Sequence, residues 1–175
     1  IQVDVAGTLV VDVPVNVTGN FAPPISGTGT FNKVGLGTLV VNTANGWVSG
    51  PVNILEGTLQ FSSGGIQNIT GGVVTVASGA YFNLNVTSNV TWAGSILGTG
   101  TVTKTGAGAL TISGPLSFGG TFDVKQGAVL ATSLPNAGGG VYGSLIIETD
   151  ATLGAASFTD TVANGTTEVY GGSIS

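Results

Sequence analysis

The chain contains no cysteine, no methionine and no histidine. These absences exclude disulfide bonds, thiol nucleophiles and soft-metal ligands, and they remove the side chain that most often transfers protons at neutral pH. Stability must therefore come from side-chain packing and from backbone hydrogen bonds. No apolar run reaches the roughly 18 residues that a membrane span needs, so we expect no insertion into a membrane.

Charge is also scarce. Charged residues make up 6% of the chain, whereas about 25% is usual in soluble domains. The net charge is −5, and the cations are Lys33, Lys104 and Lys125. Nucleic-acid binding needs clustered basic side chains, so we expect no nucleic-acid partner. Because so little lysine leaves few sites for trypsin-like proteases, we expect an extracellular or cell-surface location.

Two segments of the chain, about 70 residues apart, are alike. They read GTGTFNKVGLGTLVV at 27–41 and GTGTVTKTGAGALTI at 98–112. Apolar and polar residues alternate in both, which is the period of a β-strand. A sandwich or a barrel also fits short strands, but the internal repeat favours the coils of a solenoid. We predict an all-β fold, a right-handed parallel β-helix, over residues 23–175.

The first 22 residues form a segment of their own. Its alternating apolar residues are Ile1, Val3, Val5, Leu9, Val11, Val13, Val15 and Val17. Pro14 cannot donate a hydrogen bond, which places the strand predicted over residues 9–17 at the edge of a sheet. A β-helix leaves unpaired N–H and C=O groups at both ends. Residues 1–22 are therefore a candidate strand for pairing with a neighbouring subunit.

The two repeats, with the Gly57-Thr-Leu-Gln60 and Gly127-Ala-Val-Leu130 segments, resemble the autotransporter-associated β-strand repeat. The best-matching unit runs from about Gly98 to Ala131. This resemblance implies a parallel β-helix displayed outside a bacterial cell, usually as part of a long passenger carried by a C-terminal membrane barrel. The chain departs from that plan in having far fewer repeats.

The carboxylates suggest an enzymatic alternative, because glycosidases use paired acids. Glu148 and Asp150 lie two residues apart on one strand face. With no histidine or arginine to position a sugar or tune a carboxyl group, we predict no catalytic residues, no cofactor and no metal centre. Weak Ca²⁺ binding by this pair together with Asp160 stays an open alternative.

The two tryptophans receive different predictions. Trp92 lies two residues after Val90, so both side chains point to the same side of the strand, and Trp92 is predicted to lie in the core. Trp47 follows a glycine and is the better candidate for an exposed contact.

Two functions fit these observations. The first is a structural protein whose copies join end to end into an extracellular filament or surface layer. The second is a monomeric adhesin or passenger fragment, with glycans as candidate ligands at loops around Trp47 and residues 134–143.

Overall fold

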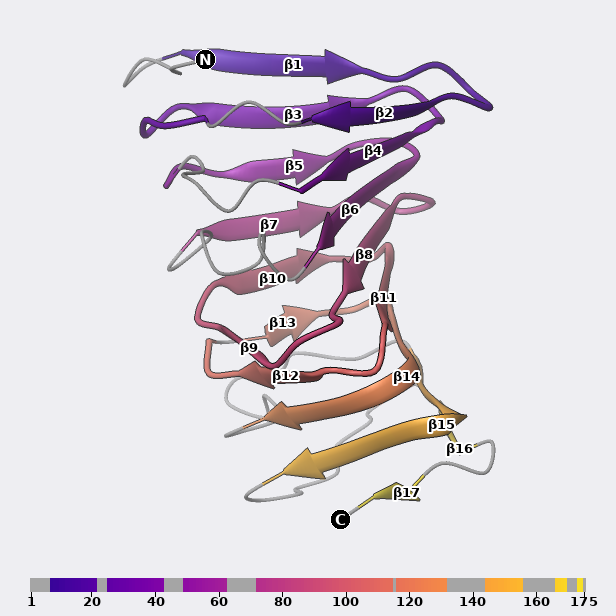
Figure 1. Ribbon diagram of the computed structural model, residues 1–175. Coiled ribbons are helices and arrows are strands. Elements are labelled where there is room, and N and C mark those ends of the chain that lie inside the picture. Colours follow the sequence, from indigo (N-terminus) through magenta and orange to yellow (C-terminus); the bar gives the residue numbers. More distant parts are fainter. Residues whose placement is uncertain are drawn as a thin grey trace.

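The computed structural model describes residues 7–21, 25–42, 49–62, 72–114, 116–131, 144–155, 166–169 and 173–174. Every regular element within these ranges is a β-strand, and every strand pair is parallel. The strands stack into a column with the N-terminus at one end and the C-terminus at the other (Figure 1). The predicted all-β parallel β-solenoid is therefore confirmed.

The strands form three faces of the column (Figure 1). Face 1 contains β1 (Thr8–Asp12), β3 (Thr30–Val34), β5 (Val52–Ile54), β7 (Val73–Val76), β10 (Ser95–Gly98) and β13 (Leu116–Phe118). Face 2 contains β2 (Thr18–Phe21), β4 (Thr38–Val41), β6 (Thr58–Ser62), β8 (Tyr81–Asn85), β11 (Thr101–Thr105), the first parts of β14 (Thr121–Ala131) and β15 (Ser144–Ala155), and β16 (Thr166–Val169). Face 3 contains β9 (Val90–Trp92), β12 (Ala109–Ile112), the later parts of β14 and β15, and β17 (Ser173–Ile174).

The core is built from in-register rows of apolar side chains. Alternate residues of each strand point inward, and equivalent positions stack from one coil to the next. One such row on face 2 is Leu39, Leu59, Phe82, Val102 and Phe122, all buried. Burial of each such side chain contributes roughly 1.5–3 kcal/mol.

Aromatic side chains pack against one another in the middle of the column. The ring centroids of Phe61 and Phe82 lie 5.7 Å apart, and those of Phe82 and Trp92 lie 5.6 Å apart, both edge to face. Edge-to-face pairs add to the free energy of area burial. Trp92 is only 1% exposed, which confirms its predicted core position.

The predicted N-terminal strand is shorter than expected. β1 ends at Asp12, and the chain then turns at Pro14, whose carbonyl accepts a hydrogen bond from the Val17 N–H at 3.1 Å. Asn16 has a φ of 62°, a conformation that asparagine tolerates and that breaks the extended chain. Val15 and Val17 therefore lie in a turn and not in a strand. Residues 1, 3 and 5 lie outside the described residues.

The two copies of the sequence repeat lie at different corners of the column. The first runs from β3 to β4, across the corner between faces 1 and 2. The second runs from β11 to β12, across the corner between faces 2 and 3. The copies are thus displaced by several coils and one additional face, so they do not stack on each other.

Candidate functional site

Among the residues that the structure describes, the first coil leaves an open strand edge at the N-terminal end. The carbonyl of Gly7 accepts a hydrogen bond from the Thr30 N–H at 2.9 Å, and the Val13 N–H donates to the Val34 carbonyl at 3.1 Å. Backbone groups of alternate residues point to opposite sides of a strand. The N–H and C=O groups of the intervening residues, Thr8, Val10 and Asp12, therefore point away from β3. Within the part of the chain that the structure describes, β1 pairs with β3 alone.

β2 has an edge of the same kind on face 2. It pairs in register with β4, and the carbonyl of Val17 accepts a hydrogen bond from the Thr38 N–H at 2.9 Å. By the same alternation, the backbone groups of Thr18 and Asn20 point away from β4. The two edges lie at one end of the column (Figure 1).

The apolar interior is only half covered at this end. Leu9, Val11 and Phe21 pack against the core but stay partly exposed. In the next coil Phe31 and Val41, which pair with Leu9 and Phe21, are 0% exposed. A further layer on this end would therefore bury additional apolar surface.

A ridge of exposed apolar side chains adjoins the open end. It follows the corner between faces 1 and 2 through three successive coils, and we name it the corner ridge. Its members are Val15, Val17, Leu36 and Leu55, with exposed fractions of 58%, 46%, 66% and 45%. The next two coils place Ser78 and Thr99 at this corner, so the ridge is confined to the N-terminal end. Contiguous exposed apolar surface is typical of interaction sites.

Two lysines are fully buried at the repeated corners. Lys33 and Lys104 have no exposed surface, and each lies in an inward-facing row between apolar neighbours. Lys33 is paired with Val11 and Ile54 in the adjacent coils. Sequence reasoning missed this arrangement: Lys33 lies two residues from Phe31 and so on the inward side of the strand, but a lysine is expected to be exposed.

Each buried ammonium group binds three backbone carbonyls. Lys33 Nζ donates to the carbonyls of Val34 at 2.8 Å, Gly35 at 2.6 Å and Glu56 at 3.1 Å. Two of these belong to its own corner and the third belongs to the next coil. An ammonium has three N–H donors, so its hydrogen-bonding capacity is used completely.

Lys104 has the same arrangement at the corner between faces 2 and 3. Its Nζ donates to the carbonyls of Thr105, Gly106 and Gln126, the last from the next coil at 2.8 Å. Burial lowers the pKa of Lys104 to about 8. Burial also lowers the pKa of Lys33, while the nearby carboxylates of Asp12 and Glu56 act in the opposite direction. The lysines act as clamps that join consecutive coils.

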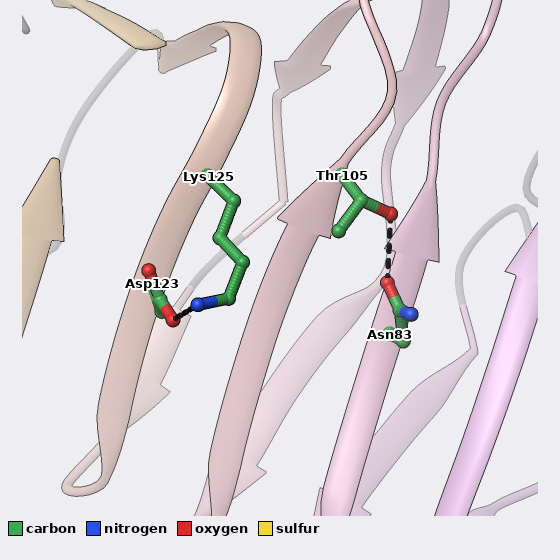
Figure 2. Close-up of polar contacts among 4 residues, drawn as sticks. All are labelled: Asn83, Thr105, Asp123 and Lys125. Carbon is green, nitrogen blue, oxygen red and sulfur yellow. Dashed lines mark hydrogen bonds and ion pairs between the residues drawn. The ribbon is translucent and has the colours of Figure 1, made fainter. Parts of the chain in front are cut away.

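Lys125 is the exposed counterpart of these two. Its Nζ lies 2.9 Å from Asp123 Oδ2 on the outer side of face 2 (Figure 2). The hydrogen bond to Asp123 raises the pKa of Lys125, and the negative charge of Asp123 acts in the same direction. Lys125 is half exposed, whereas the Asp123 side chain is only 12% exposed, so loss of Lys125 would leave a nearly buried carboxylate without its cation.

The predicted acidic pair lies on β15. Asp150 is exposed, and its backbone pairs with that of Gln126. Asp160 lies outside the described residues. The described residues contain no group of three or more acidic, histidine or cysteine side chains that could hold a metal ion. A shallow hollow on face 3 is lined by the uncharged residues Asn89, Val90, Thr91 and Thr111.

Several predicted features are not placed by the structure. Trp47 and residues 134–143 lie outside the described residues. Among the residues that are described, no helix is long and apolar enough to cross a membrane.

No protein-family model, curated protein or solved structure matches the chain. The resemblance to the autotransporter-associated repeat therefore stays a prediction.

Proposed function

We propose that the protein is an extracellular structural subunit whose copies join end to end. The observation that carries this proposal is the open first coil, in which the backbone groups of Thr8, Val10 and Asp12 face away from β3. An unpaired strand edge is a template for pairing with another chain. The half-covered interior and the corner ridge supply apolar surface for the same contact.

The direction of the strands determines the form of the assembly. If the added strand continues the parallel pattern of the column, it runs the same way as β1. The partner would then present its opposite end, where β16 and β17 lie (Figure 1). Such a head-to-tail contact does not close on itself when it is repeated along one axis, so it produces a filament. The scarcity of surface charge leaves little repulsion between stacked copies.

A proline at Val10 tests this proposal. Val10 directs its N–H to the open edge, so Val10→Pro removes one donor there and leaves the hydrogen bonds between β1 and β3 in place. We expect wild-type protein to form filaments in negative-stain electron microscopy and to sediment as polymers. The proline variant should sediment mainly as a monomer.

Val10→Ala is the matched control, because it shortens the same side chain but keeps the N–H group. It should polymerise like the wild type. A wild-type protein that stays monomeric at high concentration would refute end-to-end assembly and favour the monomeric adhesin. Unchanged filaments from Val10→Pro would show that this edge is not the contact.

Deleting residues 1–22 is a less informative test. Since β1 and β2 form the first coil, the deletion would uncover β3 and β4 and so create a new open edge.

A further inference from the structure

Tyr81 interrupts a row of threonines on the outer side of face 2. The residues paired in register along this row are Thr18, Thr38, Thr58, Tyr81, Thr101 and Thr121. Tyr81 is 49% exposed, whereas Thr58 and Thr101 on either side are partly buried. A large aromatic ring therefore stands on an otherwise flat polar surface, near the middle of the column.

Amide and hydroxyl groups beside this ring are held in place by one another. The Asn83 side-chain N–H donates to Gln60 Oε1 at 3.0 Å. Asn83 Oδ1 in turn accepts a hydrogen bond from the Thr105 hydroxyl at 3.1 Å (Figure 2). These three side chains come from consecutive strands of face 2. Because they are already ordered, a ligand that contacts them loses less side-chain entropy on binding.

This surface carries no charge at neutral pH. Its outward-facing residues from β4 to β11 are Thr38, Val40, Thr58, Gln60, Ser62, Tyr81, Asn83, Asn85, Thr101, Thr103 and Thr105. The nearest charged side chain in register is Asp123 on β14, which is paired with Lys125. A polyanion finds no cation here, and a lipid surface finds no apolar patch. An uncharged ligand with many hydroxyl groups matches both the chemistry and the charge.

We propose that the outer surface of face 2 around Tyr81 binds an uncharged polysaccharide. A sugar ring packs its C–H face on the Tyr81 ring, and its hydroxyl groups bond to the amides of Gln60 and Asn83. The coils repeat at about 4.8 Å, close to the length of one sugar unit in an extended chain. Neighbouring sugar units can therefore meet successive strands. This site is remote from the open N-terminal edge and goes beyond end-to-end assembly.

Affinity electrophoresis tests the site. Whole protein would be run through gels that contain hydroxyethylcellulose, soluble starch or galactomannan, three neutral polymers of different linkage. We expect at least one polymer to retard the wild type. Tyr81→Ala should raise the dissociation constant for that polymer by about tenfold, the equivalent of one lost aromatic contact.

Two controls separate binding from folding. Tyr81→Phe keeps the ring and should be retarded like the wild type. Leu130→Ala removes a side chain of similar exposure (42%) on face 3 and should not change retardation. The same comparison in the Val10→Pro background, in which the protein should be mainly monomeric, shows whether retardation depends on the length of the protein filament. No retardation of the wild type by any of the three polymers, or unchanged retardation of Tyr81→Ala, would overturn the proposal.

Discussion

Replacing Lys104 by methionine tests whether the buried lysines hold the coils together. Methionine has a similar length but no donor, so the carbonyls of Thr105, Gly106 and Gln126 would lose a shared partner. Replacing both partners of a buried polar interaction by apolar groups can leave stability unchanged. Lys104→Met replaces only the donor, and the backbone carbonyls remain. The Thr105 carbonyl keeps the Val86 N–H as a donor at 2.8 Å, so the loss falls on the carbonyls of Gly106 and Gln126. Each buried acceptor left without a donor costs about 1–3 kcal/mol, and no longer burying the ammonium charge offsets part of this, so we expect a net loss of roughly 2–4 kcal/mol in the free energy of unfolding.

Urea unfolding followed by circular dichroism measures this loss. Lys125→Met combined with Asp123→Asn is the matched control, because it removes the same N–H donors from an exposed position and leaves no buried carboxylate without its cation. The control should cost less than about 1 kcal/mol. If Lys104→Met unfolds within that range, the carbonyls are satisfied by other groups and the clamp interpretation is wrong.

Two further predictions concern the corners. Burial lowers the pKa of Lys104 to about 8 in the folded chain, below its ordinary value of 10.5, so the unfolded chain binds more protons between these values. Stability should therefore rise with pH from about 8 to 10.5. Lys104→Met should reduce the rise measured by urea unfolding and leave the part that comes from Lys33, whose pKa burial also lowers. Gly35→Ala should destabilise the protein by more than about 2 kcal/mol, because the glycine has a φ of 75° and a Cβ there would lie 2.4 Å from the Val13 carbonyl oxygen. Gly79→Ala, with a φ of 78° but nothing within 4 Å of the new Cβ, should show the smaller cost of backbone strain alone, and equal losses in the two variants would contradict this account.

The sequence predicted the fold class because two independent signals agreed. Apolar residues alternate with polar ones around Val102 and again at Leu110 and Ile112, which indicated strands. The repeated segment indicated stacked coils. The same alternation placed Trp92 in the core. These signals depend on local chemistry, which a single sequence shows directly.

The features that sequence reasoning missed depend on contacts between coils. Lys33 and Lys104 have inward parity, but a charged residue is expected outside unless its partners are known. Their partners are backbone carbonyls, partly from Glu56 and Gln126 in the next coil, and no residue type marks them. The end of β1 at Asp12 likewise follows from a turn at Asn16 that valines on both sides conceal.

The displacement of the two repeat copies has a consequence for any enlargement of the column. The stretch from the start of the first copy to the start of the second, residues 27–97, is one repeat unit. It spans several coils and one third of another, so inserting one more such unit would rotate all downstream surfaces by a third of a turn. A binding position carried within the unit would then wind around the column as a spiral. Tandem duplication of this unit therefore produces equivalent sites that face different sides of the column. A straight row of sites on one face would require the insertion of whole coils.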